Sequence, residues 1–163
     1  MEELKKDLFL GLSDGGQVLR VAVRLLVAAV LGGVIGFERE REGKAAGIRT
    51  HMLVSLGAAL LTLACLEAGF KSADLSRVVQ GLITGIGFLG GGTILKAKDE
   101  HQIRGLTTAA SVWMTTGLGV AVALGMLGPA LLGVALGWIV LRLMHCVEDW
   151  ARPPDQPPGS EQH

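Results

Sequence analysis

The sequence has no tyrosine, only three tryptophans and only two cysteines among its 163 residues. It also lacks the residue patterns of several functional classes. It has no cysteine–histidine spacing of a metal site, no nucleotide-binding loop, and no nucleophile accompanied by a base and an orienting acid. The net charge is zero and the basic residues form no stripe, which argues against nucleic-acid binding. The sequence therefore predicts no enzyme, no cofactor, no metal site and no nucleic-acid partner.

The most informative absence is that of charge. From Gly105 to Leu141 the chain contains no Asp, Glu, Lys, Arg or His. As one helix this run would be roughly 55 Å long, whereas the hydrocarbon core of a bilayer is about 30 Å thick. The pair Gly128-Pro129 lies inside the run, and such a pair commonly ends one helix and starts another. We therefore expect two membrane spans joined by a very tight turn.

The composition as a whole is that of an integral membrane protein. Half of the residues are hydrophobic, the mean hydropathy is +0.48, and 24 residues are glycine, which suits closely packed membrane helices. The predicted fold class is all-α, a compact bundle of five transmembrane helices. We expect a polar N-terminal segment (1–17), a membrane domain (18–150) and a disordered Pro-rich tail (151–163) without a further soluble domain. The predicted spans are Val18–Phe37, Thr50–Ala68, Val78–Leu95, Gly105–Leu127 and Ala130–Val147.

The distribution of basic residues predicts the orientation of the spans. The loops after the first and third spans and the C-terminal end are richer in Lys and Arg than the other connections. The positive-inside rule then places these three regions in the cytoplasm and the N-terminus outside. Lys5, Lys6, Arg20 and Arg24 favour the opposite orientation.

Glycine pairs spaced four residues apart recur along the spans, and such pairs allow two membrane helices to approach closely. Gly32/Gly36 and Gly133/Gly137 are examples in the first and fifth spans. The third span is so rich in glycine that we expect it to be central in the bundle and broken near 90–92. Two interpretations stay open for the glycines of this span, tight helix packing or the lining of a cavity. The glycines concerned are Gly81, Gly85, Gly87, Gly90 and Gly91.

Polar residues gather where the first span ends and the second begins. Glu38 directly adjoins apolar sequence, where a carboxylate needs a partner. Together with Arg39, it could meet Arg49, Thr50 and His51 across the loop as an ion-paired cluster. Three interpretations remain: a structural clamp, a ligand or partner site, or a solvated loop.

A second polar group opens the fourth span. Thr107 or Thr108 could cap that helix, and together with Arg104 the exposed helix start could also bind an anion. We expect this group and the first loop to meet at one membrane face.

Three segments of the chain resemble, in order, the signatures of the MgtC/SapB membrane proteins. They are the stretches 33–54 (GVIGFERE, then GKAAGIRTHMLV), 85–95 (GIGFLGGGTIL) and 104–113 (RGLTTAASVW). The resemblance covers about residues 18–147. It implies a bacterial inner-membrane protein associated with adaptation to low Mg²⁺, and in virulence-type members an action on the F-type ATP synthase. The motif positions that carry over are Glu38, Arg39, Gly47, Arg49, Thr50, His51, Gly85, Gly87, Gly90, Arg104, Gly105, Thr107 and Thr108.

Two departures from the family pattern bear on the function. Gly91 stands where the pattern usually has Ala, and the soluble ACT-like domain of the virulence-type proteins does not follow the membrane domain in this sequence. Any role that depends on that domain is therefore not expected from this sequence.

The predicted function is a non-enzymatic membrane factor for Mg²⁺ or ionic-stress homeostasis. We expect it to form a homodimer and to act by binding a membrane partner, for which the F-type ATP synthase is a candidate. An Mg²⁺ path usually needs carboxylates at membrane depth, yet beyond Glu38 the second to fifth spans hold only Glu67. The alternatives are a small ion transporter or channel with a cavity at the third span, gated by Glu38, Arg49 and His51, and a structural assembly subunit.

Overall fold

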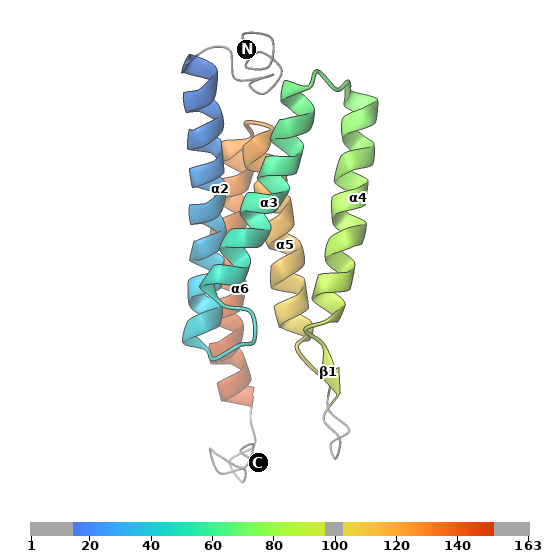
Figure 1. Ribbon diagram of the computed structural model, residues 1–163. Helices are drawn as coiled ribbons and strands as arrows, with labels where there is room; N and C mark the ends of the chain where they lie inside the picture. The colour runs from blue at the N-terminus through green and yellow to red at the C-terminus, as the bar shows by residue number, and fades with distance from the viewer. Residues whose placement is uncertain (1–14, 97–102, 152–163) are drawn as a thin grey trace.

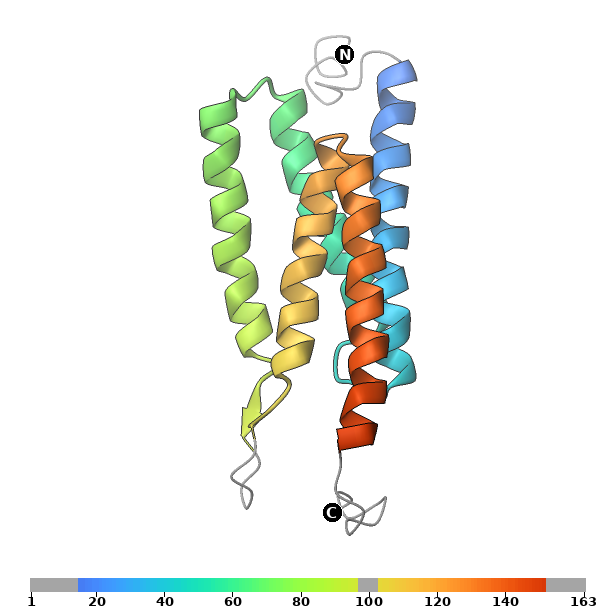
Figure 2. The ribbon, with the colours of Figure 1, turned by 180° about the vertical axis from the view of Figure 1, so that it is seen from behind.

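The structure, a computed structural model, describes residues 15–96 and 103–151. In these ranges the chain forms five long helices, which run side by side along one axis, and one short hairpin (Figure 1; Figure 2 from behind). The helices are α2 (Gly15–Arg41), α3 (Ile48–Glu67), α4 (Ser72–Gly91), α5 (Leu106–Ala123) and α6 (Leu127–Ala151). Strand β1 (Leu95–Lys96) pairs antiparallel with strand β2 (Ile103–Arg104).

This architecture confirms the predicted all-helical membrane bundle. Each predicted span corresponds to one described helix, and the hairpin contains the only strands in the described ranges. By length and composition, α2, α3 and α5 could each cross a membrane, and α6 contributes a shorter apolar stretch, Leu127–Leu143. Helix α4 is less apolar because Asp74, Arg77 and Gln80 lie in its first half.

The turn between α5 and α6 lies earlier than predicted. Helix α5 ends at Ala123, and Gly128-Pro129 belongs to the first turn of α6, where proline needs no hydrogen-bond partner for its nitrogen. Gly125 makes the turn with φ of +78°, and Met126 N donates to Ala121 O, a helix ending that favours glycine at this position.

The loops are distributed between the two ends of the bundle as the basic residues predicted. The α2–α3 connection, the hairpin and the last turns of α6 lie together at one end, here called the basic end (Figure 1). Its described lysines and arginines are Arg39, Arg41, Lys44, Arg49, Lys96, Arg104 and Arg142. The side of the membrane that this end faces, predicted to be the cytoplasm, stays a prediction.

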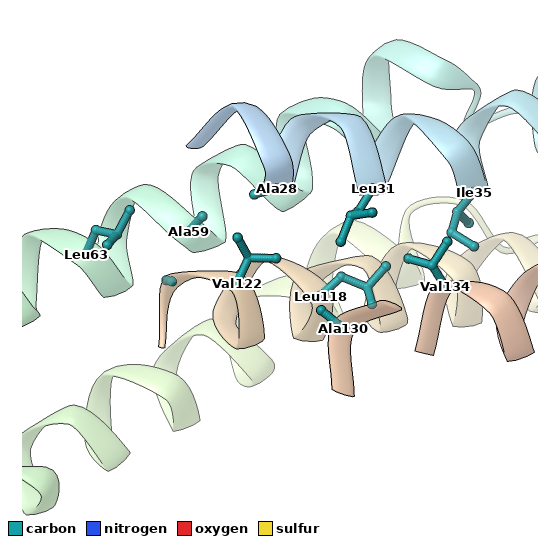
Figure 3. Close-up of a cluster of buried hydrophobic side chains, with 10 residues drawn as sticks. Ala28, Leu31, Ile35, Ala59, Leu63, Leu118, Val122, Ala130 and Val134 are labelled. Carbon is teal, nitrogen blue, oxygen red and sulfur yellow. The ribbon is translucent and has the colours of Figure 1, made fainter. Parts of the chain in front are cut away.

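The hydrophobic core is formed by α2, α3, α5 and α6. Figure 3 shows its side chains converging from these helices: Ala28, Leu31, Ile35, Ala59, Leu63, Leu118, Val122, Ala123, Ala130 and Val134. None of these residues belongs to α4, whose single buried residue is Gly90.

Glycines of α2 and α5 bring these helices against the backbone of α3. A Cβ atom added to Gly32 would lie 2.5 Å from the His51 carbonyl oxygen, and one added to Gly36 would lie 2.7 Å from the Cα of Ile48. A Cβ on Gly119 of α5 would overlap the Ser55 carbonyl oxygen. Side chains at these positions would push the helices apart, so the packing predicted for Gly32 and Gly36 is confirmed.

The prediction that the third span is central is wrong. Helix α4 stands at the side of the bundle, next to α3 and α5 (Figure 1; Figure 2). Only Gly90, whose added Cβ would lie 3.6 Å from Ala109, approaches another helix. Added Cβ atoms at Gly81, Gly85, Gly87 and Gly91 would have no atom of another helix within 4 Å. The predicted break near 90–92 is the end of the helix, at Gly91.

The substitution Gly119→Ala tests the close packing. We expect it to lower the free energy of unfolding by about 1–3 kcal/mol, the usual range for overpacking, since its Cβ meets the α3 backbone. The measurement is thermal unfolding in detergent micelles, followed by circular dichroism. Gly117→Ala is the matched control, because Gly117 lies in the same helix with nothing near it. Equal unfolding midpoints for the two variants would contradict the contact.

Candidate functional site

Ionised side chains at the basic end hold the junction between α2 and α3. Glu40 Oε2 accepts a hydrogen bond from the Ile48 backbone N–H at 2.8 Å and so satisfies one of the free donors at the start of α3. The buried guanidinium of Arg39 donates to Glu42 Oε2 at 2.6 Å, while its Nε has no partner within the described residues. The ends of the two helices therefore meet as predicted, but through Glu40, whereas the pair of Arg39 and Glu42 is local to the end of α2.

Glu38 has a partner on another helix. Its side chain is 7% exposed, and its Oε1 lies 3.3 Å from Nη1 of Arg142 on α6. The Arg142 guanidinium also lies over the Trp138 ring, 5.6 Å from the ring centroid, a distance typical of a cation–π contact. The expected ion-paired cluster thus joins α2 to α6, and Arg49 takes no part in it.

His51 is the centre of a buried hydrogen-bonded group. Its side chain is fully buried, with Nδ1 2.9 Å from the Gly47 carbonyl oxygen and Nε2 3.0 Å from Ser111 Oγ on α5. Because a carbonyl oxygen only accepts, Nδ1 carries a hydrogen, and in the neutral ring Nε2 accepts from Ser111. Ser111 Oγ also lies 2.8 Å from Thr108 O, so its hydrogen has two possible acceptors. This group connects the start of α3 with the first half of α5.

Further buried hydroxyl groups continue along the facing sides of α3 and α5. Thr62 and Thr115 donate to backbone carbonyl oxygens of their own helices at 2.8 Å. Ser55, fully buried one turn after His51, has no partner for its Oγ within the described residues. The polar surface between α3 and α5 is thus mostly satisfied locally, and the contact between His51 and Ser111 is the hydrogen bond that crosses from one helix to the other.

The start of α5 differs from the prediction. The N-cap is Gly105, in the left-handed region with φ of +93°, and no side chain caps the helix. A Cβ there would overlap the Thr93 carbonyl oxygen, so glycine is required. Thr107 and Thr108 lie inside the first turn, and the predicted capping is therefore wrong. Thr107 is exposed, whereas Thr108 is buried and its carbonyl oxygen lies 2.8 Å from Ser111 Oγ.

The remaining predicted residues lie at the same end without joining the buried cluster. Arg49 is exposed and Thr50 half-buried, and both border a groove beside Leu89 of α4. Arg104 is exposed in β2, at the base of the hairpin. The two predicted polar groups therefore share one end of the molecule, as predicted. Of their residues only His51 and Thr108 are connected, through Ser111.

Sequence reasoning missed Glu40, Ser111 and Arg142. The spacing Thr108, Ser111, Thr115 places three hydroxyl groups on one face of a helix, and this signal could have identified Ser111. Arg142 breaks an apolar run in the fifth span, which marks a residue in need of a partner. Nothing comparable distinguished Glu40 within its run of alternating charges.

Fold and site together define a helical membrane protein with a buried ionic and hydrogen-bonded cluster at one end. The model of the MgtC family matches residues 25–150, most of the chain. The chain belongs to the MgtC family.

Several curated relatives are similar over the same region. SrpB of Synechococcus elongatus is 40% identical over 129 residues, which cover 72% of this chain and 71% of SrpB. YhiD of Escherichia coli K12 is 37% identical over 131 residues, covering 76% of this chain and 60% of YhiD. MgtC of Salmonella typhimurium LT2 is 39% identical over 109 residues, covering 67% of this chain. The matched region is only 46% of that MgtC. No solved structure matches the chain.

The hydrogen bond between His51 and Ser111 is testable by a double-mutant cycle of His51→Phe and Ser111→Ala. We expect a coupling energy of about 0.5–1.5 kcal/mol in unfolding experiments in detergent, as for a single buried hydrogen bond. Thr115→Val is the control partner, because its hydroxyl bonds only within α5. A coupling of His51 to Thr115 as large as its coupling to Ser111 would refute a specific contact.

Replacing Arg142 should destabilise the protein more than replacing its partner Glu38. Arg142→Met leaves a buried carboxylate without its partner, at a cost of about 1–3 kcal/mol. Glu38→Gln should cost less, because the Arg142 side chain is 46% exposed and keeps its hydration. The double variant should be more stable than Arg142→Met alone. Denaturation midpoints of the three variants check this, and a double variant less stable than both single ones would contradict the pairing.

Proposed function

We propose that this protein is a non-enzymatic membrane factor in magnesium or ionic-stress homeostasis that acts by binding a transmembrane helix of a partner protein. The magnesium connection is supported by its relatives, since the name of E. coli YhiD proposes a role in magnesium transport. The observation that carries the binding mode is the position of α4, which leaves most of its surface without contacts to the rest of the described chain.

The outer face of α4 has the residues that helix association in membranes uses. Gln80, Thr84, Gly87 and Gly91 follow one another at spacings of four, three and four residues and are all exposed. Such spacing places them on a single face, here called the outer stripe. Gly87 and Gly91 allow close approach of a second helix, and the Gln80 amide can donate a hydrogen bond to it.

The polarity of this face favours protein over lipid as its neighbour. Gln80 lies eight residues into α4, roughly 12 Å along the helix, and an exposed amide at such a depth is costly in hydrocarbon. The Thr84 hydroxyl is satisfied by the Gln80 carbonyl oxygen at 2.9 Å, but no such bond is made for the amide of Gln80 in the described residues. A partner helix would supply one.

The described chain offers less for an ion pathway. The grooves beside α4 are lined almost wholly by apolar residues and glycine. Among the described residues no three His, Cys, Asp or Glu side chains gather in a metal-binding group. The carboxylate of Glu38 is already engaged by Arg142. Partner binding therefore fits these residues better than transport. The predicted homodimer and the F-type ATP synthase as partner stay predictions.

A photocrosslinking amino acid at Thr84 tests the proposal in native membranes. We expect a discrete crosslinked product of higher mass, which is absent when the same group replaces Leu26. Leu26, 67% exposed on α2, is the lipid-facing control. Gly87→Leu should lower the yield of the product crosslinked through position 84 by at least tenfold. It should also abolish growth at low Mg²⁺ in cells that depend on this protein.

Gly117→Leu serves as the matched control for bulk, because Gly117 is equally open but lies on α5. It should change neither crosslinking nor growth. The proposal is wrong if Gly87→Leu retains both. It is also wrong if purified protein in liposomes carries Mg²⁺ at a rate that Gly87→Leu leaves unchanged, since function would then not need the outer stripe.

A further inference from the structure

A groove runs between α3 and α4 on the side opposite the outer stripe. It has a volume of about 480 Å³ and is lined by α3, by α4 and, at its floor, by Thr116 of α5. Its α4 wall extends from Val78 to Leu89, roughly 17 Å of helix. That length is close to the thickness of one bilayer leaflet, about 15 Å. The groove is wide because Gly57, Gly81 and Gly85 line it and have nothing within 4 Å of an added Cβ.

At the basic end this groove continues into a second one with a cation at its edge. The second groove, of about 550 Å³, shares Leu53, Val54 and Leu89 with the first and adds Arg49 and Thr50. Arg49 is exposed and forms no ion pair with another residue in the described ranges. Two other arginines of the basic end, Arg39 and Arg142, are held by carboxylates.

We propose that these two grooves form a binding site for one anionic phospholipid of the leaflet at the basic end. The headgroup phosphate is held by the Arg49 guanidinium and the Thr50 hydroxyl, and one acyl chain lies along the glycines of α3 and α4. The grooves match such a lipid in charge and in length. Arg49 is the cation at one end, and the apolar groove is about as long as one acyl chain in a leaflet.

A lipid also fits the shape of this surface better than a helix does. A helix is about 10 Å across with its side chains, whereas an acyl chain has no side chains and can lie against Gly57, Gly81 and Gly85 in the groove. A lipid at this position would fill the space between α3 and α4 and hold α4 beside the bundle. The outer stripe on the opposite side of α4 would stay available, so the two proposals are independent.

The test compares binding of phosphatidylglycerol and phosphatidylcholine to the purified full chain in detergent, counted as lipids retained per protein by native mass spectrometry. We expect wild-type protein to retain one phosphatidylglycerol in preference to phosphatidylcholine. Arg49→Gln should weaken that binding roughly fivefold, as expected for the loss of one cationic contact. Gly57→Leu, which fills the groove, should weaken binding of both lipids at the site.

Two matched controls make the result specific. Lys44→Gln removes an equal charge at the same end but outside both grooves, and Gly117→Leu adds the same bulk elsewhere. Both should retain the lipid. The proposal is overturned if wild-type protein shows no preference for the anionic lipid, or if Lys44→Gln and Arg49→Gln weaken binding equally. It is also overturned if Gly57→Leu leaves the lipid bound but converts a dimer to a monomer, because a second copy would then occupy the groove.

Discussion

The close approach of α2 and α5 to the backbone of α3 is the contact on which the rest of the structure depends. In a bilayer, lipid surrounds apolar side chains as readily as protein does, so helices associate through close packing and polar contacts. Gly32 and Gly36 bring α2 against α3, and Gly119 brings α5 against the same helix from another side. These contacts occur at His51 and Ser55, which is why polar side chains of α3 are fully buried there.

Once the three helices are this close, the buried polar residues determine how they align. The hydrogen bond between His51 and Ser111 connects α3 with α5, and the ion pair between Glu38 and Arg142 connects α2 with α6. Both contacts lie toward the basic end. At the opposite end the Arg24 guanidinium of α2 donates to the Ala123 carbonyl oxygen where α5 ends, and the Gln17 amide of α2 donates to the Glu67 carboxylate of α3. Helix α4 takes part in none of these contacts, and Gly90 is its single buried residue.

The sequence predicted the helices well and their arrangement less well. The charge-free run after Gly105 and the glycine pair Gly32/Gly36 reflect local physical requirements, and both led to correct expectations. The position of α4 could not be predicted, because glycines that face lipid and glycines that face protein look identical in a sequence. The partner of Glu38 is 104 residues away on α6, a pairing that depends on how the helices fold together. Similarly, the helix start at Gly105 depends on its close contact with the Thr93 carbonyl oxygen. The sequence instead suggested a cap at Thr107 or Thr108, because this contact is not visible in it.

Oxygen accessibility of spin labels in lipid bilayers tests the central claim, that α4 stands outside a core formed by its neighbours. Single labels at Thr84 on α4, Leu26 on α2 and Val122 in the core would be compared in purified protein, after replacement of Cys65 and Cys146. Val122 is fully buried and the Leu26 side chain is 67% exposed, so they set the two limits of the scale. We expect the label at Thr84 to be as accessible to oxygen as the label at Leu26. Accessibility as low as that of Val122, in protein shown to be monomeric, would place α4 inside the bundle and contradict this claim.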